Sequence, residues 1–149
     1  MTEYPLDVCI LLDEQAEARL ASGNRNSRQV SYEEARDVLV RANEAGLVLT
    51  SILRTGDDAP TTICNCCPCC CYTLQLLIHY GLAPKILTSD KVTGYDSEQC
   101  VGYHVCVDRC HFGALSLNEG QIIFHSEKCL GCGQCVTVCP SGAVSLSSR

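Results

Sequence analysis

The sequence predicts an α+β protein, with a mainly helical, cysteine-rich segment over residues 1–91 and a small α+β domain over residues 92–149. Two observations support this prediction. The first segment contains stretches with apolar residues at helical spacing, and the second contains an internal repeat of cysteines and short apolar runs. A chain of 149 residues is long enough for one domain or two very small ones.

The helical prediction for the first segment depends on two stretches. Residues 6–21 carry apolar residues at helical spacing, which predicts an amphipathic helix with Cys9 in the core, or alternatively as an added metal ligand. Further on, Ser31 and Glu34 have the spacing of a capping box, and Gly46 stands where a helix C-cap glycine belongs. A second helix is therefore expected between Ser31 and Gly46.

The remaining elements follow from shorter signals. Residues 47–53 are apolar and partly β-branched and predict a strand, whereas residues 54–62 are polar and predict a linker. Residues 72–80 predict a helix ended by Gly81 and Pro84. A short strand is expected at residues 92–95.

Composition narrows the function classes. The chain has 14 cysteines, but its start shows no signal peptide and no apolar run approaches the length of a membrane span, so we expect a cytoplasmic protein. In a reducing compartment, cysteines indicate metal binding or redox chemistry rather than structural disulfides. The formal net charge of −6 gives no support to nucleic-acid binding.

The repeat in the second segment has a displacement of 29 residues. This displacement superposes three cysteines of one half on three of the other, namely Cys100, Cys106 and Cys110 on Cys129, Cys135 and Cys139. It also superposes residues 113–117 on residues 142–146. Residues 114–118 and 121–126 flank Glu119-Gly120 and predict a hairpin. Each half is expected to contain a cysteine loop, a short helix and a strand.

The second half contains the run Cys129-x₂-Cys132-x₂-Cys135-x₃-Cys139-Pro140. This spacing is that of the bacterial iron–sulfur run C-x₂-C-x₂-C-x₃-C-P. Small residues between the first three cysteines let the loop curl so that three thiolates converge, while the fourth cysteine reaches another cluster. Zinc fits less well, because the four cysteines do not form two separated pairs.

Over residues 92–149 the sequence resembles the two-cluster bacterial ferredoxins, on this run and on the repeat. The resemblance implies a ferredoxin-like two-cluster fold and electron transfer to a redox partner protein. It implies that Cys110, Cys129, Cys132 and Cys135 hold one [4Fe–4S] cluster, and that Cys100, Cys106 and Cys139 hold the other.

The first half departs from this family at one ligand position. Tyr103 stands where the family has a cysteine, His104 follows it, and His111 replaces the proline after Cys110. The second cluster is then either a [3Fe–4S] cluster or a [4Fe–4S] cluster with Tyr103, His104 or water at the fourth iron. Alternatively, the Tyr103 ring fills the pocket and no cluster forms. We expect a bound cluster with a non-cysteine position, because three cysteines keep their spacing.

Residues 63–71 form a cysteine block of unusual density. Its six cysteines are Cys64, Cys66, Cys67, Cys69, Cys70 and Cys71. Adjacent cysteines bridge each other poorly, and crowded buried thiols bring no packing advantage, so metal binding remains. Thiolate-rich sites select zinc, Cu(I) or iron–sulfur clusters, and the neighbouring ferredoxin-like unit favours an iron–sulfur cluster. Neighbouring side chains diverge, so either three or four cysteines bind, or the block binds a larger cluster.

From the capped helix to the end, residues 31–149 resemble a poorly characterised group of ferredoxin-domain proteins from anaerobes that carry a similar block. The chain departs from that group at Tyr103 and at Leu49, where a histidine is expected. The sequence therefore predicts an iron–sulfur electron-transfer protein with an extra cluster site. The alternatives are an enzyme that uses an incompletely ligated cluster for sulfur transfer or reductive chemistry, and a redox or metal sensor.

Overall fold

The computed structural model describes residues 4–53, 56, 58–81 and 89–149. Contacts divide the chain into two compact units, Met1–Cys67 and Pro68–Arg149, so the boundary falls inside the cysteine block. The sequence predicts a domain boundary between residues 91 and 92, and that boundary remains a prediction. Among the described residues, no helix is long and apolar enough to cross a membrane.

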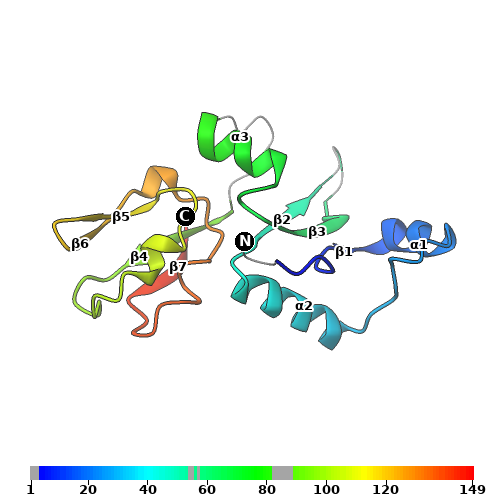
Figure 1. Cartoon of the computed structure of the whole chain (residues 1–149), viewed down its shortest axis with the longest axis horizontal. Coiled ribbons are helices and arrows are strands. Elements are labelled where there is room, and N and C mark those ends of the chain that lie inside the picture. The colour runs from blue at the N-terminus through cyan, green and yellow to red at the C-terminus, as the bar shows by residue number, and fades with distance from the viewer. Residues whose placement is uncertain (1–3, 54–55, 57, 82–88) are drawn as a thin grey trace. The chain divides into compact units, whose positions relative to one another are not determined.

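The N-terminal unit combines helices with a small antiparallel sheet (Figure 1). Its elements are β1 (Ile10–Leu11), α1 (Asp13–Ala21), α2 (Tyr32–Glu44), β2 (Val48–Ile52) and β3 (Thr62–Cys66). The strand order is β1-β3-β2, which places β3 in the centre of the sheet. The first half of the cysteine block is therefore a central strand, which the sequence did not predict.

The helix predicted over residues 6–21 is wrong in its first half. Ile10 and Leu11 pair with β3, and the Leu12 N–H donates to the Thr61 carbonyl at 2.9 Å. Just before the strand, Val8 is buried, and Cys9 is exposed rather than in the core. Tertiary strand pairing here outweighs the local helical spacing.

The second predicted helix is confirmed with its caps. The Ser31 side chain accepts from the Glu34 N–H, and the Glu34 carboxylate accepts from the Ser31 N–H. Gly46 follows the helix with a φ of 84°, the left-handed conformation that glycine adopts without strain. The helix buries Ala42 against Val8 and Leu47 in the core of this unit.

The strand β2 confirms the prediction for residues 47–53. It pairs with β3 along its whole length, from Val48 opposite Cys66 to Ile52 opposite Thr62. Residues 54, 55 and 57 of the predicted linker lie outside the described residues.

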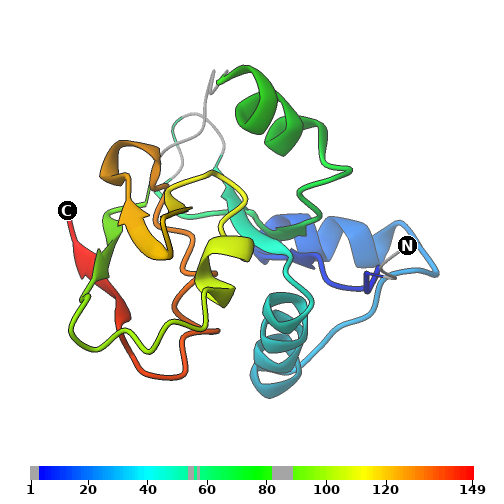
Figure 2. The same ribbon diagram turned by 60° about the vertical axis from the view of Figure 1, so that its left-hand side comes forward.

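The C-terminal unit contains one longer helix and two strand pairs (Figure 2). Its elements are α3 (Tyr72–Tyr80), β4 (Lys91–Tyr95), α4 (Val105–Asp108), β5 (Leu115–Asn118), β6 (Gln121–Phe124), a single 3₁₀ turn (Ser126–Lys128) and β7 (Val144–Ser148). The helix α3 has the predicted bounds and ends at Gly81, whose φ is 62°; Pro84 lies outside the described residues.

The strand pairing reproduces the 29-residue repeat. The strands β4 and β7 are antiparallel, with Tyr95 opposite Val144, and β5 and β6 are antiparallel, with Leu115 opposite Phe124. Shifting Leu115 and Phe124 by 29 residues in opposite directions gives Val144 and Tyr95, so the two registers are equivalent. Each half contributes its first strand to a pair with the last strand of the other half.

The two halves differ in one element. Residues 105–108 form the short helix α4, whereas the equivalent residues 134–137 form turns. The predicted short helix is therefore present in the first half, and wrong for the second. The predicted hairpin about Glu119-Gly120 is confirmed; Glu119 and Gly120 both have positive φ, as a tight hairpin turn requires.

Candidate metal centres

Four cysteines of the repeat line one pocket of the C-terminal unit, which we call site 1. They are Cys110, Cys129, Cys132 and Cys135. Three come from the curled loop of the second half, and Cys110 lies two residues after the end of α4 in the first half. The structure thus brings together the four residues that the ferredoxin resemblance assigns to one cluster.

Hydrogen bonds point at the sulfur atoms of site 1. The Thr93 hydroxyl on β4 lies 3.5 Å from the sulfur atoms of both Cys129 and Cys135. The Thr93 N–H donates to Cys129 at 3.5 Å, and the Ala114 N–H donates to Cys110 at 3.2 Å. The two N–H donors aimed at sulfur stabilise the thiolate, which is the form that binds metal.

The cysteines of site 1 differ in acidity. Burial acts to raise the pKa of Cys129, but hydrogen bonds from Thr93 and the Gly131 N–H, together with the Arg149 charge, outweigh it and lower the pKa. Burial raises the pKa of Cys132 to about 11 and also raises the pKa of Cys135. Metal binding would therefore have to displace protons from Cys132 and Cys135, the thiols whose pKa is raised.

The loop of site 1 is pressed against the start of β4. Gly131 has a φ of 71°, and a Cβ atom there would overlap the Lys91 carbonyl oxygen and lie 2.8 Å from Ser89 Cβ. Arg149 fastens the same loop, because its guanidinium donates to the Cys129 carbonyl and to the Ser89 carbonyl. A glycine is required at this close approach of two backbone segments.

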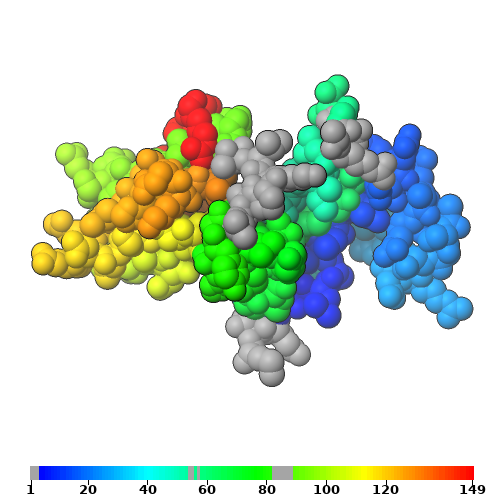
Figure 3. Space-filling model, turned by 90° about the horizontal axis from the view of Figure 1, so that it is seen from above, coloured from blue at the N-terminus to red at the C-terminus, as the bar shows by residue number. Residues whose placement is uncertain are grey.

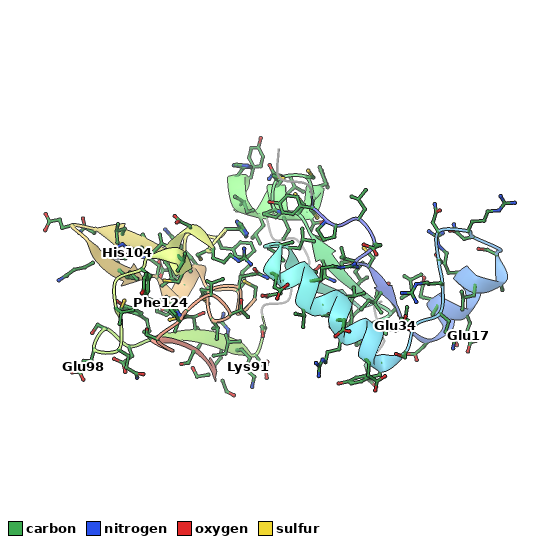
Figure 4. All side chains as sticks on the ribbon, turned by 60° about the horizontal axis from the view of Figure 1, so that its bottom comes forward. Glu17, Glu34, Lys91, Glu98, His104 and Phe124 are labelled. Atoms are coloured by element: carbon green, nitrogen blue, oxygen red, sulfur yellow. The ribbon has the colours of Figure 1, made fainter. Side chains whose placement is uncertain are left out.

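The other three cysteines of the repeat line a second pocket, which we call site 2. They are Cys100, Cys106 and Cys139, and Tyr103 and His104 line the same pocket. Cys139 crosses from the second half to reach site 2, as Cys110 crosses from the first half to reach site 1. Figure 4 shows His104 on the loop before α4 and Phe124 at the end of β6.

Site 2 has its own hydrogen bonds to sulfur. A hydrogen bond with the Cys100 thiol is the main cause, and burial the second, that together raise the pKa of Tyr95 to about 12. Burial raises the pKa of Cys106. For Cys139 burial also acts upward, but hydrogen bonds from Ser141 and nearby backbone N–H groups lower its pKa.

The backbone of site 2 follows that of site 1 at the altered position. Gly102 and His104 have φ values of 75° and 59°, and their repeat equivalents Gly131 and Gly133 have 71° and 75°. A left-handed conformation is uncommon for a non-glycine residue such as histidine, so the loop keeps its shape despite the changed sequence. Tyr103 lies between them, at the position of Cys132, and its side chain is 71% exposed.

The cysteine block is divided between two local structures. Cys64 and Cys66 lie on β3 and, being two residues apart, project to one face of the sheet. The hydroxyl of Thr50 is 3.9 Å from the Cys66 sulfur. Asn65 projects to the opposite face, is buried, and donates to the Val8 carbonyl at 2.6 Å.

The second half of the block is a turn that leads into α3. The sulfur atoms of Cys67, Cys69 and Cys70 all lie within 4.8 Å of one another, and those of Cys69 and Cys70 are 3.5 Å apart. Because these residues lie within four consecutive positions, their approach follows from the local chain conformation. Cys71 is the N-cap residue of α3 and is not part of this group. Leu49 lies opposite Asn65 and not opposite a cysteine.

Sequence reasoning missed the residues that surround the ligands. Thr93 and Tyr95 contact cysteine sulfur atoms, and Gly131 allows the close approach of the loop. A signal was present for two of them, because the 29-residue shift superposes Thr93 on Ile122 and Tyr95 on Phe124. Where a polar residue of one half superposes on an apolar residue of the other half, the two sites differ in their surroundings.

Comparison with known proteins agrees with the geometry of the second half. Residues 122–145 match the model of the 4Fe-4S binding domain family, a segment that runs from β6 into β7 and contains Cys129, Cys132, Cys135 and Cys139. No curated protein sequence matches the chain. The match and the convergence of cysteines identify an iron–sulfur protein with a 4Fe-4S binding segment.

Proposed function

We propose that the chain is an electron-transfer protein of the two-cluster ferredoxin type that exchanges electrons with a redox partner protein in the cytoplasm. The observation that carries this proposal is the convergence of four cysteines on site 1, inside and beside the matched segment. A [4Fe–4S] cluster bound there supplies reversible one-electron chemistry.

The residues of site 1 fit such a cluster by the chemistry of their donors. Four thiols are present for four irons, and the N–H groups of Thr93 and Ala114 point at sulfur. The pocket is buried on the side of Thr93, Cys129 and Cys135. Burial and hydrogen bonding of this kind are the means by which a protein sets the reduction potential of a cluster.

In our proposal site 2 holds a second cluster with Cys100, Cys106 and Cys139 as its thiolate ligands. Support comes from the shared backbone of the two loops and from the equal register of the strands that carry them. Tyr103 occupies the fourth position, so the centre is [3Fe–4S], or [4Fe–4S] with a non-cysteine group at one iron. The cysteine block would hold a third metal centre, supported by the proximity of Cys67, Cys69 and Cys70.

A reductive titration of anaerobically purified protein tests the carrier function. We expect reversible one-electron reduction of each cluster, followed by electron paramagnetic resonance, with iron and sulfide retained over repeated cycles. Loss of iron on the first reduction, or a cluster that dithionite fails to reduce, would contradict an electron carrier.

A second candidate function is enzymatic, and the exposure of Tyr103 favours it. A position that lacks a thiolate and opens to solvent allows a small substrate to reach one iron, which acts as a Lewis acid. Sulfur transfer or a reductive cleavage suits such a site. Binding of a small thiol or of sulfide that changes the resonance signal of site 2, but not that of site 1, would favour the enzyme.

A further inference from the structure

We propose that the turn containing Cys67, Cys69 and Cys70 binds a single soft d¹⁰ cation, Zn²⁺ or Cu⁺, through three thiolates. This inference narrows the proposed third metal centre, for which the sequence favoured an iron–sulfur cluster. It is independent of the clusters at sites 1 and 2, which involve other cysteines.

The spacing of the sulfur atoms is the first argument. A zinc–thiolate bond is about 2.3 Å long, so thiolates that share one ion in tetrahedral or trigonal geometry lie about 3.8–4.0 Å apart. The three sulfur atoms of the turn lie within 4.8 Å of one another, and two of them are 3.5 Å apart. The distances between the three sulfur atoms of the turn are therefore already close to those around one shared ion.

The ferredoxin cysteines provide an internal comparison. Each thiolate of a [4Fe–4S] cubane binds a different iron, so the four sulfur atoms are held further apart than around one shared ion. Within the described part of the chain, which includes all 14 cysteines, no three of the cysteines of sites 1 and 2 approach within 4.8 Å of one another. One chain thus contains wide thiol sets that suit cubanes and a narrow set that suits an ion.

The surroundings of the turn support an anionic thiolate set. The turn precedes α3, a helix of nine residues whose first N–H groups and dipole stabilise negative charge. The Gln75 amide on α3 donates to the Pro68 carbonyl and holds the turn against the helix. Pro68 is buried, whereas Cys69 and Cys70 are exposed, so an ion can reach the thiols without unfolding. Figure 3 shows the green segment around α3 at the surface.

The strand cysteines are not part of this set. Cys64 and Cys66 lie on β3, and neither belongs to the group of converging sulfur atoms. They have the same residue type and the same sequence neighbourhood, so their replacement controls for the loss of two thiols from the block, although they are half-buried and Cys69 and Cys70 are exposed.

The experiment uses the full chain with its iron–sulfur clusters loaded under anaerobic conditions. Zn²⁺ and, separately, Cu⁺ are added, excess metal is removed, and bound metal, iron and sulfide are counted. X-ray absorption at the zinc or copper edge then reports the number of sulfur neighbours. We expect one tightly bound ion per chain with three sulfur ligands, and no displacement of iron.

The variant Cys69→Ser/Cys70→Ser should lose this ion and keep the iron and sulfide of sites 1 and 2. Both side chains are exposed, so the substitution leaves the core intact, whereas Cys67 packs against the core of the N-terminal unit and is left unchanged. The control Cys64→Ser/Cys66→Ser should keep the ion.

Two results overturn the inference. Loss of iron and sulfide in the Cys69→Ser/Cys70→Ser variant would show an iron–sulfur cluster at the turn. Failure of wild-type protein to bind either ion, or equal loss of the ion in the control variant, would show that the turn is not a mononuclear site. The resonance signals of sites 1 and 2 report on the proposed electron-transfer function independently of either result.

Discussion

Sites 1 and 2 occupy equivalent places in the two halves of one repeat, yet they present different chemistry to a metal. The strands that carry them share the same register, and the two loops share the same left-handed positions. Site 1 has four cysteines, whereas site 2 has three and an exposed tyrosine. The backbone of the repeat thus tolerates a change of ligand without losing its shape.

The sites also differ in what surrounds the sulfur atoms. At site 1 the Thr93 hydroxyl approaches two cysteine sulfur atoms, whereas its repeat equivalent at site 2 is the apolar Ile122. At site 2 the hydroxyl of Tyr95 contacts Cys100, whereas its equivalent at site 1 is Phe124. Since hydrogen bonds to sulfur raise the reduction potential of a cluster, the two sites are expected to have different potentials.

The largest effect is expected from removing a cysteine of site 1, such as Cys132, whose repeat equivalent at site 2 is Tyr103. Cys132→Ser, and likewise Cys135→Ser, should remove one cluster's worth of iron and destabilise the C-terminal unit, because clusters bind the folded state only. Iron and sulfide analysis measures the loss of the cluster, and urea unfolding measures the loss of stability. The matched control is Tyr103→Ser, which removes no thiolate and should retain the iron of site 1. Unchanged iron content in the Cys132→Ser protein would refute the assignment of site 1.

The next largest effect concerns the glycines of the two loops. Gly131→Ala should destabilise the protein by roughly 3 kcal/mol or more, because a left-handed φ and a backbone overlap act together. Gly102→Ala has the same unfavourable φ but meets nothing within 4 Å, so its cost should be only about 1–2 kcal/mol. Urea unfolding of the cluster-loaded proteins measures the difference in the free energy of unfolding between the two variants. Equal costs would mean that the loop of site 1 is not held against β4.

A change at site 2 is expected from restoring the missing ligand: a gain of one iron at a [3Fe–4S] centre, or a changed resonance signal at a centre that already has four irons. Tyr103→Cys places a thiol on a loop that already has the required shape, and should convert site 2 to an ordinary [4Fe–4S] centre. Iron counting and electron paramagnetic resonance before and after the substitution measure the change. Identical iron counts and spectra would show that Tyr103 is not at a ligand position and that the repeat alignment fails there.

The smallest effect is expected from the hydrogen bonds. Thr93→Val keeps the shape of the side chain but removes the hydroxyl, so the potential of site 1 should become more negative, on the order of tens of millivolts. Because the lost hydrogen bond lowers the pKa of Cys129, the variant should also need a higher pH to bind iron. The control Ile122→Val alters the equivalent position at site 2 and should leave site 1 unchanged. A potential that does not move in Thr93→Val would show that the hydroxyl does not act on the cluster.

Several features were predictable because their signals are local. The capping box at Ser31 and Glu34 and the bounds of α3 depend on neighbouring residues, and both were confirmed. The runs that flank Glu119-Gly120 predicted the hairpin, and the two halves of the 29-residue repeat have equivalent registers. The cysteine run contained enough information to indicate an iron–sulfur protein before any contact was known.

Other features depended on residues far apart in the sequence. The strand β1 forms because Ile10 and Leu11 pair with residues some fifty positions later, which no local periodicity reports. The same pairing places part of the cysteine block in the centre of a sheet and separates Cys64 and Cys66 from the turn. The hydroxyl of Thr93 reaches cysteines 36 and 42 residues away.

The amino-acid sequence by itself determined which side chains can bind metal and how closely they follow one another along the chain. Spacing of a few residues restricts the backbone directly, so the run from Cys129 to Cys139 was recognisable without a structure. The tertiary structure alone decided which thiols meet in one place, how far apart their sulfur atoms lie and which donors reach them. These properties depend on strand pairing and on the approach of distant backbone segments, as at Gly131 and Lys91. The physical reason is that coordination is set by distances in space, and distances beyond a single turn of chain arise only from packing.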